Sequence, residues 1–96
     1  MNKYELMIIY KENLDEKEVK EQIELLKEKI AEFKGKVTNE DYWGLKDFAY
    51  EMSKQVQGYY DILTLEIEPS EINKVMEWLR HQQETVLKTM LTKLED

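Results

Sequence analysis

The sequence contains no cysteine, only three glycines, one proline and one histidine. Without thiols, the chain cannot form disulfides, thiolate metal sites or a cysteine nucleophile, which agrees with a reducing compartment. So few glycines do not make a phosphate-binding loop or a nucleophile elbow. His81 is a lone imidazole with no second imidazole or thiol to complete a usual metal site. We therefore expect no enzymatic activity, no metal and no cofactor.

Long hydrophobic runs are also missing from the sequence. A membrane-spanning helix needs about 18 or more consecutive apolar residues, and a secretory signal needs an apolar stretch behind a basic start. Neither pattern is present, and Met1–Glu5 begins the chain with mixed polarity. We expect a cytoplasmic protein with no membrane association. The 96 residues and 42% hydrophobic content fit one domain over residues 1–96.

Acidic side chains outnumber basic ones, and the formal net charge is -7. Such a charge opposes RNA binding by the isolated chain, because most nonspecific affinity comes from basic groups that neutralise phosphates. The acids gather in 15–32 and 66–77, whereas several lysines fall outside these segments. An RNA-binding role would therefore need a basic partner protein.

Hydrophobic spacing predicts four strands separated by two helices. Asp15 and Glu18 form a capping-box pattern at the start of the first helix, and Gly35 is expected to end it in the left-handed conformation. Ser70 is expected to cap the second helix. The strands are expected at Lys3–Tyr10, Lys36–Met52, Tyr59–Glu68 and Thr85–Leu94, and the helical stripes are Val19, Ile23, Leu26, Ile30, Phe33 and Ile72, Val75, Met76, Leu79.

Two further features concern the long second strand. Gly44 lies inside it and predicts a bulge or bend, and Ser53–Gln57 is expected to form the turn to the third strand. The order β-α-β-β-α-β with right-handed crossovers predicts an α+β, ferredoxin-like fold, in which two helices cover one face of a four-stranded antiparallel sheet. The other face stays open and is rich in aromatic and aliphatic residues, which predicts a partner there.

The segment from Trp43 to Tyr60 has an ordered mixture of glycines, bases and aromatics that is too specific for an ordinary hairpin. It resembles the central hairpin of the bacterial small-subunit ribosomal protein S-six family. Asp47 and Glu51 depart from the family pattern, where a second base and a proline are usual. The residues that match are Gly44, Leu45, Lys46, Ala49, Tyr50, Lys54, Gly58 and Tyr59.

The resemblance extends over nearly the whole chain, because Tyr4-Glu5, Asn13–Asp15 and Val86–Lys93 fit the family at the first strand, the first helix and the last strand. It implies a structural constituent of the small ribosomal subunit that binds the central domain of small-subunit ribosomal RNA. It also implies that binding occurs together with a basic protein, ribosomal protein S-eighteen. No small-molecule substrate is implied.

Candidate site residues follow from the residue types and the resemblance together. Lysines and the arginine are candidates for phosphate contacts, and aromatic side chains are candidates for a wet protein interface. Arg80 could equally pair with a nearby acid. The RNA-binding candidates are Lys46, Lys54, Lys88, Lys93, Lys3 and Arg80, and the partner-interface candidates are Trp43, Tyr50, Tyr59 and Tyr60.

Three other functions share the predicted fold. A sheet-platform RNA-recognition motif would need a base before Gly58, where Gln57 stands, and a stacking aromatic at Asp61. An acylphosphatase-type enzyme would need an arginine near Lys11–Asn13, where none is present. A third possibility is a stand-alone ferredoxin-like dimer that binds a small molecule. The hairpin resemblance is the one feature of the sequence that argues against it.

Overall fold

The computed structural model describes residues 1–51 and 54–94, without the side chains of residues 48–51 and 54–56. The described residues form four strands and two helices in the predicted order β-α-β-β-α-β. The sheet is antiparallel, with the strand order β2-β3-β1-β4. The elements are β1 (Asn2–Lys11), α1 (Glu16–Glu32), β2 (Lys36–Glu51), β3 (Lys54–Ile67), α2 (Pro69–Arg80) and β4 (Val86–Leu94). The ferredoxin-like fold predicted from the sequence is confirmed.

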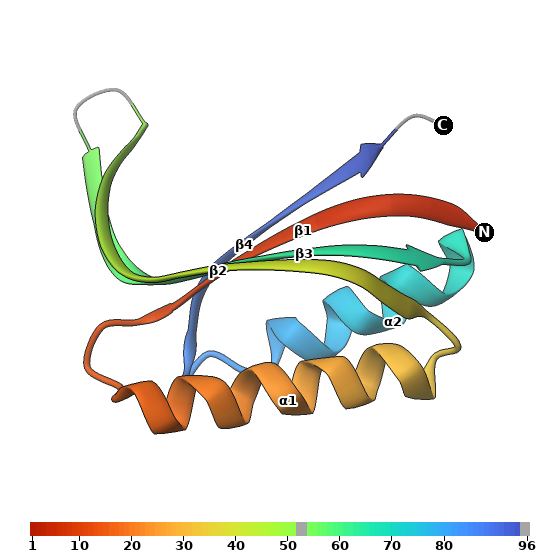
Figure 1. The fold of residues 1–96 in the computed structure, drawn as a ribbon, viewed down its shortest axis with the longest axis horizontal. Helices are drawn as coiled ribbons and strands as arrows, with labels where there is room; N and C mark the ends of the chain where they lie inside the picture. Colours follow the sequence, from red (N-terminus) through yellow and green to blue (C-terminus); the bar gives the residue numbers. More distant parts are fainter. Residues whose placement is uncertain (52–53, 95–96) are drawn as a thin grey trace.

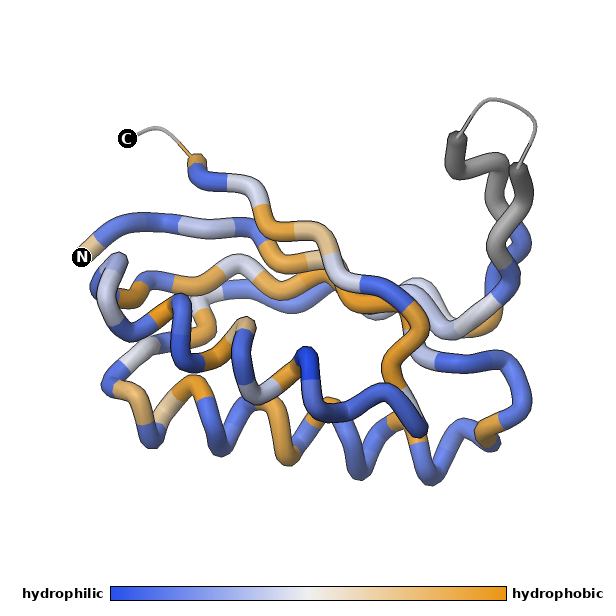
Figure 2. Tube along the Cα trace, turned by 180° about the vertical axis from the view of Figure 1, so that it is seen from behind, coloured by the Kyte–Doolittle hydropathy of each residue, from blue (hydrophilic) through white to orange (hydrophobic). Residues whose placement is uncertain are grey.

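Both helices lie on the same side of the sheet (Figure 1). Hydrophobic and hydrophilic segments alternate along each helix, as expected for helices with one buried face (Figure 2). The core between these layers contains Val19, Ile23, Leu26 and Ile30 of α1, as the helical stripe predicts, and Ile72, Val75 and Leu79 of α2. The sheet supplies Tyr4, Leu6, Ile8, Tyr10, Tyr59, Leu63, Leu65 and Ile67.

The start of α1 is the capping box that the sequence predicts. The Asp15 carboxylate accepts a hydrogen bond from the Glu18 backbone N–H at 2.8 Å, and Glu18 accepts one from the Asp15 backbone N–H at 3.2 Å. These two bonds use backbone donors that the first helical turn leaves without partners. The capping box therefore fixes the residue at which α1 begins after β1.

The end of α1 differs from the prediction at Gly35. Lys34, with φ 65°, is the residue in the left-handed conformation, and Gly35 follows it. The Gly35 N–H donates to the Ile30 carbonyl at 2.8 Å, and the Lys34 N–H donates to the Ala31 carbonyl at 3.0 Å, which is a Schellman ending. Glycine is required at position 35 for space, because a β-carbon would lie 2.9 Å from side-chain atoms of both Ile30 and Ile67.

The start of α2 also differs from the prediction that Ser70 is its cap. The helix begins at Pro69, and Glu68 is the N-cap residue. Proline suits the first helical position because its φ is already helical and its missing N–H would have no helical acceptor there. Ser70 consequently lies inside the first turn.

The β2–β3 hairpin is longer than the turn predicted at Ser53–Gln57 allows. β1 stops pairing with β3 at Gly58, but β2 and β3 continue to pair as far as Glu51 and Lys54. Lys54 to Gln57 are therefore strand residues with backbone partners in β2, and Ser53 lies outside the described residues. The result is a two-stranded arm that bends away from the helices (Figure 1).

Candidate partner and RNA interface

The sheet face opposite the helices is the first candidate surface. Met7 of β1 pairs with Ile62 of β3 and Met90 of β4, and Ile9 pairs with Tyr60. Since paired residues in neighbouring strands point to the same side, these side chains share a face. Together with Trp43, they form what we call the open-face patch: Met7, Ile9, Trp43, Tyr60, Ile62 and Met90.

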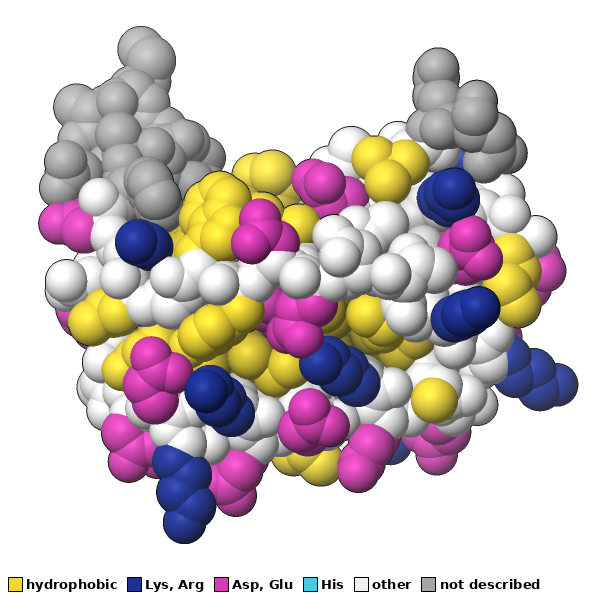
Figure 3. Space-filling model, viewed as in Figure 1, with side chains coloured by type: hydrophobic (Ala, Val, Ile, Leu, Met, Phe, Trp, Pro, Cys, Tyr) yellow, Lys and Arg dark blue, Asp and Glu magenta, His cyan; other side chains and the backbone are white. Residues whose placement is uncertain are grey.

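Trp43 is the most distinctive member of the open-face patch. Its ring stacks on Tyr60, with centroids 6.1 Å apart and planes at 19°, and its indole N–H donates to Asp41 at 2.9 Å. Trp43 is 39% exposed and covers Tyr60, which is 3% exposed. Burial, followed by the charge of Asp47, raises the pKa of Tyr60. In Figure 3 the open face is at the top of the view, with the helices below the sheet, and hydrophobic side chains are visible there.

Gly44 explains how Trp43 reaches this position. It has φ 78°, and the β2–β3 register shifts between Tyr42 and Gly44, which confirms the predicted bulge. A bulge re-aims the side chains beside it and increases the local twist. Trp43, the residue in the bulge, lies over Tyr60 as a consequence.

Tyr59, predicted for the partner interface, lies on the other side of β3. It is 7% exposed, belongs to the core cluster, and donates its hydroxyl to the Leu14 carbonyl at 2.9 Å. Neighbouring residues of a strand point to opposite faces, so Tyr59 and Tyr60 cannot serve the same surface. The interface prediction is wrong for Tyr59, which is a core residue of this chain.

Two further candidates, Tyr50 and Lys54, have side chains outside the described part of the structure. Their backbones belong to the arm: Tyr50 lies in β2, and Lys54 opens β3 opposite Glu51. Their predicted roles remain predictions.

The remaining lysine candidates are spread over both edges of the sheet. Lys46 is exposed on β2, which is one edge strand, whereas Lys88 and Lys93 lie on β4, which is the other. Lys88 pairs with Ile9 on the open face, but Lys93 pairs with Tyr4 on the helix side. Lys3, paired with Glu66, is exposed on β1. The structure therefore does not gather these lysines into one cluster.

Arg80 is the last residue of α2 and forms an ion pair with Glu77 at 3.1 Å. His81 approaches the same carboxylate at 3.3 Å. Both side chains of the Arg80–Glu77 pair are largely exposed, so the pair is weak and leaves the guanidinium accessible. Arg80 and Lys88 line a groove of about 330 Å³ between α2 and β4, which brings two of the predicted RNA-binding residues close together.

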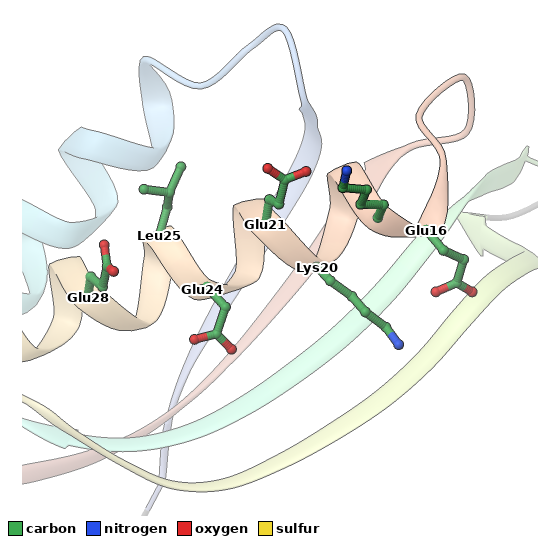
Figure 4. A pocket seen from close by; sticks show the side chains of 7 residues that line it. Glu16, Lys20, Glu21, Glu24, Leu25 and Glu28 are labelled. Atoms are coloured by element: carbon green, nitrogen blue, oxygen red, sulfur yellow. The ribbon is translucent and has the colours of Figure 1, made fainter.

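The outer surface of α1 has a shallow hollow of about 710 Å³ that is lined only by residues of this helix. Its side chains diverge rather than converge: Lys20 and Glu24 point to one side, and Glu21, Leu25 and Glu28 point to the other (Figure 4). A ligand site needs polar groups that converge on one position. This hollow therefore has no feature of an active site.

The described residues include neither a cluster of metal-ligating side chains nor a helix that could span a membrane. No group of three His, Cys, Asp or Glu side chains among them is placed to hold a metal ion. Neither described helix combines the length and the apolar character that crossing a bilayer requires.

Sequence reasoning missed a buried charged cluster around Asp61. Asp61 is fully buried, and burial, followed by hydrogen bonding and charge from Glu40, raises its pKa to about 8. Lys27 donates to Glu40 at 2.6 Å, and this bond raises the pKa of Lys27. The sequence did contain a signal for this burial. Asp61, Leu63 and Leu65 are two residues apart in one strand, so Asp61 points into the core with the two leucines.

Comparisons with known proteins agree with the resemblance seen in the sequence. Residues 3–93 match the family described as Ribosomal protein S6. The small ribosomal subunit protein bS6 of Saccharopolyspora erythraea is 38% identical over 89 residues, which cover 93% of this chain and 75% of that protein. The bS6 protein of Caldanaerobacter subterraneus subsp. tengcongensis is 31% identical over 96 residues, which cover 100% of both chains.

Solved structures give the same result. The crystal structure of 30S ribosomal protein S6 from Thermotoga maritima has a TM-score of 0.85 and 26% identity, and the match covers 97% of this chain and 87% of that chain. A protein from Arabidopsis thaliana has a TM-score of 0.61 at 12% identity, covering 100% of this chain and 95% of that chain, and shares the fold alone. The chain belongs to the ribosomal protein S6 family of the bacterial small ribosomal subunit.

Proposed function

We propose that this chain is a structural protein of the small ribosomal subunit that binds the central domain of small-subunit ribosomal RNA together with ribosomal protein S-eighteen. Family membership supports the subunit, and the open-face patch supports a protein partner. The observation that carries the proposal is the exposed Trp43 ring, stacked on buried Tyr60, on a sheet face that both helices leave uncovered. Large, rigid aromatic side chains of this kind are enriched in the cores of protein interfaces.

The net charge of -7 explains why a partner comes first. A basic protein on the open face would add the cationic groups that this chain lacks, and the pair would then meet RNA phosphates. Lys46 at one edge of the sheet and Lys88 at the other are placed to extend such a basic surface. The role is architectural: the two proteins would present one rigid shape that holds a folded RNA junction.

The test is a binding assay with a central-domain RNA fragment, with and without purified S-eighteen. We expect weak RNA binding by the chain alone, tight binding by the pair, and a steep loss of affinity with rising salt. The chain should also enter small subunits during reconstitution. Failure to form the pair, or equally tight RNA binding without the partner, would contradict the proposal.

The open face could instead be covered by a second copy of the chain, as the dimeric alternative requires. Light scattering of the isolated chain distinguishes the two. The ribosomal proposal expects a monomer that becomes a heterodimer when S-eighteen is added. A stable homodimer that does not exchange with S-eighteen would favour the alternative.

A further inference from the structure

Asp61 occupies a place in the core that an apolar residue would normally fill. It lies on β3 in the row that also contains Leu63, Leu65 and Ile67, and it is 0% exposed. An ionised carboxylate in such a place loses its hydration and needs hydrogen bonds or an opposite charge in return. The structure must therefore contain something that makes this burial tolerable.

Hydrogen-bond donors do not provide the answer. Neither carboxylate oxygen of Asp61 has a donor in hydrogen-bonding geometry among the described residues, and the backbone N–H of Ile62 lowers the pKa of Asp61 less than burial raises it. The nearby Tyr10 hydroxyl oxygen has no hydrogen-bond partner there either. Burial followed by the charge of Asp61 raises the pKa of Tyr10, which keeps that phenol protonated. As an ion, Asp61 would therefore be both buried and poorly satisfied, which strongly disfavours its charged form.

The groups that face Asp61 come from three neighbouring elements. Ile8 and Tyr42 are its paired residues in β1 and β2, and the Tyr42 hydroxyl donates away from it, to Glu16 of α1 at 2.9 Å. Glu40 of β2 raises the pKa of Asp61 by hydrogen bonding and by its charge, and Lys27 of α1 acts more weakly in the opposite direction.

The contacts of Glu40 with Lys27 indicate which of the two carboxyl groups, Glu40 or Asp61, carries the negative charge. The Lys27 ammonium is 2.6 Å from a Glu40 carboxylate oxygen, and both side chains keep some contact with water, being 31% and 26% exposed. Two adjacent carboxyl groups do not readily ionise together, and the one with the ammonium and the solvent keeps its charge more easily. The proton is then expected on Asp61, where it turns an unsatisfied acceptor into a donor.

We propose that Asp61 is protonated in the folded protein and donates its proton to Glu40, so that Asp61, Glu40 and Lys27 form a proton-dependent clamp joining β3, β2 and α1. Asp61 and Tyr60 are neighbours in β3 and therefore point to opposite faces of the sheet. The clamp lies on the helix side of β3, and Tyr60 lies on the open face. Loss of the proton would leave two carboxylates side by side in the β2–β3 half of the core.

The clamp gives stability a definite dependence on pH. The pKa of Asp61 is raised to about 8 in the folded chain, from 3.8 in water. The folded state therefore holds a proton that the unfolded state releases. The stabilisation is fully present below about pH 4 and is lost as pH rises through the folded value, near pH 8. Between these limits one proton changes the folding equilibrium constant by about tenfold per pH unit.

The test compares the wild-type chain with Asp61→Asn, which imitates the neutral side chain, in urea unfolding from about pH 5.5 to 9. Relative to the variant, the wild-type folding equilibrium constant should fall about tenfold per pH unit up to about pH 7.5 and level off above about pH 8.5. Glu5→Gln, which neutralises an exposed carboxylate on β1, is the matched control and should keep the wild-type slope.

A measurement on the wild-type chain keeps the proposal testable if Asp61→Asn does not fold. Carbon-13 NMR of the carboxyl groups should show one aspartate titrating several units above the others, with Glu40 responding at the same pH. Parallel pH profiles for wild type and Asp61→Asn, or an Asp61 carboxyl that titrates below about pH 5, would overturn the clamp. Neither readout involves RNA or S-eighteen, so the clamp is tested separately from the proposed function.

Discussion

Both faces of the sheet carry apolar side chains but use them differently. On the helix side, Leu6, Leu63 and Leu65 are fully buried within the chain itself. On the open side, Ile9 and Tyr60 are buried, but Trp43 at 39% and Met90 at 44% remain exposed. The helix side therefore stabilises the fold, and the open side keeps apolar area available for another molecule. Each of the following predictions tests this division.

The largest effect is expected for Leu6→Ala, which acts on the helix side. Leu6 pairs with Leu63 and Leu91 and is 0% exposed, so truncation leaves a cavity. We expect a loss of about 3 kcal/mol in the free energy of unfolding, measured in urea. Met7→Ala, on the opposite face, should cost less than half as much. Equal losses would contradict the division between the faces.

Trp43→Ala tests the open side. A large aromatic at the centre of an interface commonly contributes about 2 kcal/mol or more, so affinity for S-eighteen should fall at least about 30-fold by calorimetry. Stability should change by only about 1 kcal/mol, because Trp43 is partly exposed. The matched control is Leu25→Ala on α1, another partly exposed apolar residue. Unchanged affinity in Trp43→Ala would contradict the proposed surface.

Tyr59→Phe sharpens the contrast between two adjacent tyrosines. It removes the hydrogen bond that the Tyr59 hydroxyl donates to the Leu14 carbonyl at 2.9 Å, and should cost about 1 kcal/mol of stability. Partner affinity should stay the same. Tyr42→Phe removes a hydroxyl bound to exposed Glu16 and should cost less. A loss of partner affinity in Tyr59→Phe would place Tyr59 in the interface after all.

The smallest effect is expected for Lys46→Ala in the RNA complex of the protein pair. Removing one phosphate contact should weaken RNA binding several-fold and reduce the slope of log affinity against log salt by about 1. Lys17→Ala, an exposed lysine on the outer surface of α1, is the control and should leave the slope unchanged. Identical slopes for the two variants would remove Lys46 from the RNA surface.

Much of this fold could be predicted because local patterns and tertiary structure agree. The stripe from Val19 to Ile30 predicts a helix with one buried face, and the helix has that face. Gly44 predicts a bulge, and the bulge carries Trp43 onto Tyr60. In such places the sequence signal is the physical cause of the structure.

The misses come from places where partners distant in sequence decide the outcome. The Schellman ending puts Lys34 in the left-handed conformation, whereas Gly35 is needed for space where Ile30 and Ile67 approach it. Lys54 to Gln57 are strand residues because β2 continues beside them, which local composition does not reveal. The cluster around Asp61 was missed because Glu40 and Lys27, which act on the pKa of Asp61, lie 21 and 34 residues earlier in the chain.

The candidate site was predicted less completely than the fold. Residue type made Trp43, Tyr60 and Tyr59 equal candidates, but it could not show that Tyr59 lies on the helix side and the other two on the open side, because adjacent residues of a strand differ only in the face they occupy. The lysines were grouped by residue type and by the family resemblance, neither of which gives their distances, and three of them lie on the two edge strands of the sheet: Lys46, Lys88 and Lys93.

The most direct measurement of the central claim is an NMR titration of the methionine-methyl-labelled chain with S-eighteen. Met7 and Met90 lie on the open face, whereas Met76 of α2 packs against the core on the other side and serves as an internal reference. The account predicts shifts at Met7, Met90 and the Trp43 indole N–H, with little change at Met76. Shifts confined to Met76, with the open-face signals unmoved, would contradict it.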